Sequence, residues 1–245
     1  MLRIIQLSDC HISASTNTRY RGIDPRQSLE SLLPAVRAWA PHVVLLTGDL
    51  AEDGSGEAYE YLASQLQTLG VELFTIPGNH DHRLRQKNVF AATALEDPLL
   101  IERGNWQLIL LNSAVDGQVP GTLTGRMIHG LERALSYQVA ARIIVLHHQP
   151  VMSGSPWIDR FPLLQAEKFW SCLDGRQDVR AVLWGHIHHA WTGQRNGVKL
   201  LGAPSTSVNT LADQEKFNFD VAGPACRWLE LGAGGRLETG ILHAG

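Results

Sequence analysis

The sequence has only three cysteines, Cys10, Cys172 and Cys226, and they are far apart with no CxxC spacing. We therefore expect reduced thiols, with neither a disulfide framework nor a structural zinc site. No apolar run reaches the roughly 20 residues of a membrane span. The first apolar segment begins almost at Met1, with no signal-peptide pattern before it. These absences predict a cytoplasmic protein that does not contact a membrane.

An excess of charge of one sign is also lacking. The 21 basic and 24 acidic residues leave a net charge of -3, and no run of five like charges occurs. This balance argues against a nucleic-acid partner, and a nuclease would need a basic stripe along which to track the phosphate backbone. A Gly-rich loop of the nucleoside-triphosphate type is missing too, so we do not expect an ATPase. A small anionic ligand would need a local positive source, such as a metal ion.

The chain has 245 residues, of which 44% are hydrophobic, and this is enough to fill a large core. Neither a repeat nor a low-complexity linker divides it, so we predict a single domain over residues 1–245. Apolar runs alternate with helical periodicity, which favours an α/β fold with helices covering both sides of a β-layer. The predicted strands are 3–7, 42–46, 71–76, 106–111, 142–146 and 179–184, the helices 28–40, 57–69, 125–137 and 165–173, and the hairpins 191–201 and 227–242.

Polar residues with ligand chemistry follow five of the predicted strands. In open α/β sheets, the loops at the carboxyl ends of the strands converge at one edge, where ligands bind. Residues two apart at a strand end project to the same side, so Asp-x-His and His-x-His pairs can face one cavity. Gly48, Gly78 and Gly185 each precede a candidate ligand and allow close backbone approach. The candidate ligands are Asp9, His11, Asp49, Asn79, His147, His186 and His188.

Seven oxygen and nitrogen donors exceed the needs of one tetrahedral ion. Two ions that share a carboxylate would use them, and a donor set without thiolate suits Mn, Fe, Co or Zn. Each element alone has an ordinary explanation: a capped loop, a turn, or a surface or core histidine. The conjunction of five such strand ends in one chain is what favours a dinuclear metal site.

The order of these blocks resembles that of the calcineurin-like metallophosphoesterases: D-x-H, G-D, G-N-H-D/E, a His at a strand end, and G-H-x-H. The resemblance implies a four-layer α/β fold of two packed mixed β-sheets flanked by helices. Longer stretches are similar to the class III (CpdA-type) bacterial 3′,5′-cyclic AMP phosphodiesterases, although relatives with other phosphodiester substrates share parts of them. These stretches are 47–51, 146–151 followed by 154–159, and 200–206.

The resemblance also implies a ligand set for two divalent transition-metal ions, with iron and manganese favoured and zinc or cobalt as alternatives. Asp49 would bridge the ions. His147 matches the family pattern better than His148, which would then be a packed group or a support for a ligand. His82 and His189 lie outside the motif and are expected to be solvated. One ion would be held by Asp9, His11, Asp49 and His188, and the other by Asp49, Asn79, His147 and His186.

Our hypothesis for the reaction is attack of a metal-bound hydroxide on phosphorus, with 3′,5′-cyclic AMP opened to 5′-AMP. His80 would contact the phosphate and protonate the departing alkoxide, and Asp81 would orient the His80 ring. The alternative is that His80 only forms hydrogen bonds to neighbouring residues and transfers no proton. The substrate would contact His11, Asp49, Asn79, His80 and His188. Candidates for the rim of the pocket are Trp157, Asp159, Pro204, Ser205, Thr206 and Asn209.

Two other functions stay open from sequence alone. One is hydrolysis of a different small phosphoester, such as a glycerophosphodiester or a 2′,3′-cyclic nucleotide. The other is a non-catalytic scaffold of the same fold, whose mark would be the loss of ligand residues, and none of the seven is lost here. Oligomeric state cannot be read from the sequence.

Overall fold

Alternate side chains of the central strands are buried in different cores. In the computed structural model, which describes residues 1–245, Val43 and Leu45 of β2 (Val43–Thr47) lie in a core between two sheets. Val44 and Leu46 lie in a second core, beneath helices α1 (Pro25–Trp39) and α2 (Gly56–Gln67). Both faces of the strand are covered, which explains its unbroken apolar sequence.

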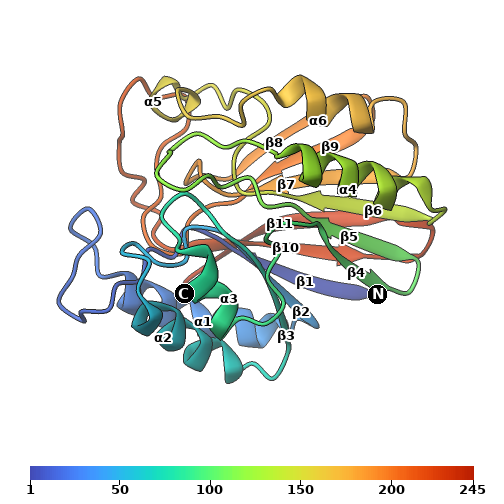
Figure 1. Cartoon of the computed structure of the whole chain (residues 1–245). Helices are drawn as coiled ribbons and strands as arrows, with labels where there is room; N and C mark the ends of the chain where they lie inside the picture. The colour runs from blue at the N-terminus through green and yellow to red at the C-terminus, as the bar shows by residue number, and fades with distance from the viewer.

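The first sheet has five strands in the order β11-β10-β1-β2-β3. Its parallel part comprises β1 (Leu2–Leu7), β2 and β3 (Glu72–Ile76), whereas β10 (Ala225–Leu231) and β11 (Leu237–His243) form an antiparallel hairpin beside β1. Helices α1, α2 and α3 (Arg83–Val89) lie together on the outer side of this sheet (Figure 1).

The second sheet has six strands in the order β4-β5-β6-β7-β9-β8, with antiparallel strands only at its two edges. Helices α4 (Gly125–Ser136) and α6 (Ala166–Leu173) cover its outer face over a third core, and the short α5 (Pro156–Asp159) lies at one end (Figure 1). The strands are β4 (Leu99–Arg103), β5 (Trp106–Leu110), β6 (Ala141–Val145), β7 (Val179–Trp184), β8 (Trp191–Arg195) and β9 (Val198–Gly202).

Both predicted hairpins are confirmed. Between β8 and β9, Asn196 and Gly197 have φ of 49° and 85°, as a type I′ turn requires of its two central residues. Between β10 and β11 the chain turns through the short η1 (Ala233–Gly235). No helix is both long and apolar enough to cross a lipid bilayer.

The four layers implied by the family resemblance are confirmed, but the single β-layer favoured by the strand and helix alternation is wrong, since the strands divide into two sheets. The sequence patterns also missed α3, α5 and β4, which are short. Helix α1 begins at Pro25 rather than at residue 28, because the Asp24 carboxylate accepts hydrogen bonds from the backbone N–H groups of Arg26 and Gln27.

The carboxyl ends of β1, β2 and β3 meet those of β6 and β7 at one end of the sandwich, on the left of Figure 1. Backbone contacts join these loops: Asp9 N–H donates to Gly48 O at 3.0 Å within the first sheet. Across the sheets, His186 N–H donates to the Asp9 carboxylate at 3.1 Å. The loops that follow both sheets therefore form one rigid edge.

Removing a side chain from the core between the sheets should destabilise the protein strongly. Leu45 is fully buried there, so Leu45→Ala is expected to lower the free energy of unfolding by about 2–5 kcal/mol. Leu84 is 65% exposed on α3, and Leu84→Ala should change it by no more than about 0.5 kcal/mol. Equilibrium urea unfolding of both variants measures the difference, and equal losses would contradict the packing described here.

Candidate metal centre

Four ligand-type side chains from both sheets converge just beyond β1, β2 and β7. His11 Nε2 lies 3.2 Å from His188 Nε2 and 4.0 Å from an Asp49 carboxylate oxygen. His188 Nε2 lies 3.4 Å from an Asp9 oxygen. All four residues are buried. The carboxylates and imidazoles therefore face a common point, as a metal site requires.

A second group adjoins the first and shares Asp49. The same Asp49 oxygen that faces His11 lies 3.5 Å from His147 Nε2, and the ring centroids of His147 and His186 are 5.1 Å apart. Asn79 Oδ1 is buried without a hydrogen-bond partner, and so is His147 Nε2. Possible ligand atoms form overlapping clusters here: Asp9 with His11 and His188, Asp49 with Asp9 and His147, and His147 with His148 and His186. With Asn79 beside them, all seven predicted ligand residues lie at one edge.

The hydrogen bonds of the outer ring nitrogens fix which inner nitrogens carry lone pairs. The Nδ1 atoms of His147 and His188 lie 2.7 Å from the carbonyl oxygens of Thr47 and Val208. Because a carbonyl only accepts, each Nδ1 carries the proton and each Nε2 presents a lone pair. His11 Nδ1 lies 2.7 Å from a Glu52 oxygen, and burial lowers the pKa of His11. Two lone pairs 3.2 Å apart, on His11 and His188, repel unless a cation lies between them.

In the second group, the acidic neighbours favour positive charge at His147. Although burial disfavours a charged ring, the Asp49 and Asp9 carboxylates raise the pKa of His147 to about 9. The His147 Nε2 atom is therefore a position at which a proton or a metal ion is stabilised. The donor chemistry of both groups fits divalent transition-metal ions.

The backbone at the site is strained. Non-glycine residues rarely adopt positive φ, and five of the ten that do so in this chain are candidate ligands. Such strain costs on the order of 1–3 kcal/mol per residue and is retained where the surroundings impose it, often at functional sites. The five residues are Asp9, His11, Asp49, His186 and His188, with φ between 47° and 68°.

Two of the glycines next to ligands are required by close contacts. A Cβ atom on Gly78 would lie 2.2 Å from Asp49 Oδ1, and one on Gly48 would lie 2.4 Å from His147 Nδ1. Gly48 also has a φ of 90°, which side chains disfavour. Any larger residue at these positions would displace the Asp49 carboxylate or the His147 ring.

His80 lies beside the ligand groups, but a different carboxylate from the expected one orients it. Asp81 accepts hydrogen bonds from the backbone N–H groups of Gly78, Leu50 and Ala51 and from the Tyr59 hydroxyl. The expectation that Asp81 orients the His80 ring is therefore wrong: its carboxylate holds the two ligand loops together. The His80 ring instead has its Nδ1 atom 3.1 Å from Glu52 Oε2.

Glu52 is the residue that sequence reasoning missed. Its Oε2 atom contacts both His11 Nδ1 and His80 Nδ1. Burial opposes its charge, yet the hydrogen bonds from the two rings lower the pKa of Glu52 to about 2. Burial also disfavours a charged His80, but Glu52 and Asp49 raise the pKa of His80 to about 9. The only sequence signal was an acidic residue three positions after Asp49.

The remaining histidines separate by their contacts. Both ring nitrogens of His148 are occupied, by Ser113 Oγ at 2.8 Å and Val119 O at 3.0 Å, which favours His147 as the ligand. His82 is exposed and accepts a hydrogen bond from Arg85 N–H at the start of α3. His189 is 4% exposed, with Nδ1 bonded to Ile187 O, so the expectation that it is solvated is wrong.

A cavity of about 660 Å³ opens above Asp49, Asn79, His80, His186 and His188. Of the expected rim residues only Trp157 lines it. Asp159 instead accepts hydrogen bonds within its own loop, and the segment 204–209 is buried, with Ser205 Oγ donating to Asp9 O. Sequence reasoning missed the other rim side chains, which carry no motif: Tyr20, Arg21, Val119, Pro156, Ile158, Arg160, Phe161, Glu215, Lys216 and Phe217.

Comparison with known proteins gives a consistent assignment. A family model described as calcineurin-like phosphoesterase matches residues 2–190. The chain is 35% identical to a 3′,5′-cyclic adenosine monophosphate phosphodiesterase of Pseudomonas aeruginosa, over 97% of this chain and 88% of that one. It is 33% identical to a 3′,5′-cyclic-nucleotide phosphodiesterase of Nostoc sp., over 98% and 91% of the two chains.

A solved structure of a dimetal phosphatase from Danio rerio has the same fold. It matches with a TM-score of 0.69 over 100% of this chain and 99% of that chain, at 14% sequence identity. The match to the family model spans most of the chain, and relatives more than 30% identical cover nearly all of it. The chain belongs to the calcineurin-like phosphoesterase family.

Proposed function

We propose that the protein is a metal-dependent phosphodiesterase that hydrolyses 3′,5′-cyclic AMP to 5′-AMP. The observation that carries the chemistry is the convergence of buried imidazoles and carboxylates beneath one cavity, where His147 Nε2 and Asn79 Oδ1 have no hydrogen-bond partner. The substrate is supported by the relatives from Pseudomonas aeruginosa and Nostoc sp., whose names give cyclic nucleotides and whose lengths this chain nearly covers.

The donor groups fit two divalent ions, with iron or manganese favoured and zinc or cobalt as alternatives. When bound, two such ions supply a nucleophile at neutral pH and neutralise charge on the phosphoryl oxygens. Asp49 would be shared, because its carboxylate faces both His11 and His147. One ion would be held by Asp9, His11, Asp49 and His188, and the other by Asp49, Asn79, His147 and His186.

The role of His80 follows from its contacts. Glu52 and Asp49 favour the protonated ring, and His80 also lines the cavity. In hydrolysis, water adds to phosphorus, the bond from phosphorus to O3′ breaks, and O3′ takes up a proton. His80 would donate that proton, and Glu52 would hold the ring in position. The phosphodiester would contact Asp49, Asn79, His80 and His188 at the floor of the cavity, whereas His11, also expected to contact it, is buried and does not line the cavity.

A substrate panel tests the proposed function. The protein reconstituted with Mn²⁺ or Fe²⁺ should hydrolyse 3′,5′-cyclic AMP with a higher kcat/KM than it does 2′,3′-cyclic AMP, a glycerophosphodiester or a phosphomonoester. Product analysis should give 5′-AMP. Turnover confined to one of the other substrates would reject the cyclic AMP assignment, and no turnover of any substrate with both ions bound would favour the scaffold.

Metal analysis tests the assignment of His147 against His148. After reconstitution with Mn²⁺, His147→Ala should retain about one ion fewer per chain than the unaltered protein, because its Nε2 faces Asp49. His148→Ala is the matched control and should keep both ions, since its ring nitrogens bond to Ser113 and Val119. Elemental analysis alongside thermal unfolding separates loss of an ion from loss of the fold. The reverse pattern would exchange the two assignments.

The pair of His80 and Glu52 should behave as a unit. His80→Ala is expected to lower kcat by about 10²- to 10⁴-fold with both ions retained. Glu52→Gln should lower activity by about 10- to 100-fold, because the charge that orients His80 and His11 is lost.

Asp53→Asn is the control for this pair, since its carboxylate bonds to Ser55 and Ala14 instead. In the double variant His80→Ala/Glu52→Gln, the two losses should be less than additive. Full additivity would show that Glu52 does not act through His80.

A further inference from the structure

The cavity above the candidate metal centre is walled by three segments that are far apart in the sequence. Its volume of about 660 Å³ is within the range of small-molecule sites. Asp49, Asn79 and His188 lie at its floor. The outer wall takes residues from segments 13–24, 150–162 and 203–224. A ligand whose phosphate lies on the floor would therefore place its remaining atoms against these segments.

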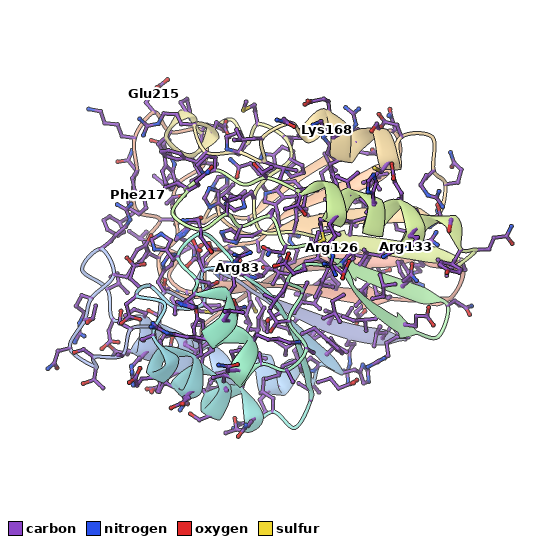
Figure 2. The ribbon with its side chains drawn as sticks, viewed as in Figure 1. Arg83, Arg126, Arg133, Lys168, Glu215 and Phe217 are labelled. Atoms are coloured by element: carbon purple, nitrogen blue, oxygen red, sulfur yellow. The ribbon has the colours of Figure 1, made fainter.

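Phe217 joins the three segments. The Arg21 guanidinium lies 3.9 Å from the centroid of the Phe217 ring, and the Trp157 ring lies edge to face with it at 5.3 Å. Figure 2 shows Phe217 on the segment between β9 and β10, at the same end of the molecule as α5. These contacts hold a half-buried aromatic ring at the wall of the cavity, where aromatic groups of a ligand can pack against it.

Trp157 contributes an unused hydrogen-bond donor. Its indole Nε1–H is buried and has no partner, although buried donors are nearly always paired. Trp191 Nε1 donates to Ser153 O at 2.9 Å, and the Nε1 atom of Trp184 also has no partner, but neither of these residues lines the cavity. Trp157 lines the cavity, so a small shift of its side chain on binding would let a ligand acceptor such as a ring nitrogen reach this donor.

The wall is also more cationic than the chain as a whole. Arg21, Arg160 and Lys216 line the cavity with a single acidic residue of the wall, Glu215. The whole chain has a net charge of -3. The excess of positive charge at the cavity wall, in a chain with a negative net charge, favours an anionic ligand at the mouth of the cavity. Cationic, aromatic and donor groups are the combination that a nucleotide, with its phosphate and its base, would use.

We propose that Phe217 and Trp157 form the binding site for the base of a nucleotide substrate. They would thereby make the enzyme prefer cyclic nucleotides over phosphodiesters without a base. The base packs against the Phe217 ring, which Arg21 holds in place, and accepts a hydrogen bond from Trp157 Nε1. This inference rests on the proposed function and goes further, because it names the residues that read the part of the substrate remote from phosphorus.

The test compares two substrates that differ only in the base: 3′,5′-cyclic AMP and the 3′,5′-cyclic phosphate of methyl riboside. Base stacking corresponds to roughly 5- to 150-fold on removal of one aromatic ring. Phe217→Ala in the metal-loaded protein should lower kcat/KM for cyclic AMP by a factor in this range. Its kcat/KM for the base-free analogue should stay within about twofold.

Two further variants keep the test informative if the loop is disturbed. Phe219 lies in the same loop, 5.1 Å from Phe217 and 49% exposed, but does not line the cavity. Phe219→Ala should therefore leave the ratio of the two kcat/KM values unchanged. Trp157→Phe keeps an aromatic ring and removes the N–H, so it should lower kcat/KM for cyclic AMP and spare the base-free analogue.

Two results would overturn the proposed base-binding site and leave the proposed function standing. One is an equal loss of kcat/KM on both substrates in Phe217→Ala, and the other is the same change in the ratio of the two kcat/KM values in Phe219→Ala. An unchanged ratio in both Phe217→Ala and Trp157→Phe would do the same. If the unaltered protein hydrolysed the base-free analogue and not cyclic AMP, both proposals would fall together.

Discussion

Two imidazole nitrogens that face each other across the sandwich set the central constraint of this structure. His11 follows β1 of the first sheet, His188 follows β7 of the second, and their Nε2 atoms are 3.2 Å apart. Each ring is oriented by an acceptor at its outer nitrogen, so neither inner nitrogen is free to turn away. A cation bound by both rings would remove this repulsion, and the nearby carboxylates of Asp9 and Asp49 would stabilise it.

The surroundings make that arrangement rigid. Asp9, at a positive φ, has its carbonyl oxygen bonded by the hydroxyls of Ser205 and Ser207 and its carboxylate bonded by His186 N–H. Asp81 performs a similar task between the loops after β2 and β3. Donors that are held before a ligand arrives need little reorganisation when it binds. The strained backbone angles are therefore stabilised by many separate contacts within the protein.

Most of the fold and the ligand residues could be predicted from sequence, because each depends on local patterns. Apolar runs marked the strands, and the short ligand motifs directly after them marked the edge at which the loops meet. The division into two sheets was not visible in those patterns. A strand such as β2 has the same apolar sequence whether helices or a second sheet cover its faces. The two-sheet arrangement was implied only by the resemblance to the calcineurin-like metallophosphoesterases.

The errors at the site share a cause. Asp81 adjoins His80 in the sequence, yet the ring of His80 turns to Glu52, because the backbone of the loop directs the two neighbouring side chains to different partners. His189 adjoins the His-x-His pair and is nevertheless buried. Phe217 has no motif at all, and its place at the cavity depends on how three distant loops pack. Contacts of this kind are set by tertiary structure and leave no periodic signal.

The origin of the donors in both sheets has a consequence for how long the folded chain persists. The candidate ligands extend from residue 9 to residue 188, so an unfolded chain cannot present them together. A ligand that binds only the native state shifts the folding equilibrium, by about 2.7 kcal/mol when its free concentration is 100 times its Kd. The supply of divalent ions in the surroundings would then regulate the abundance of this protein as well as its chemistry.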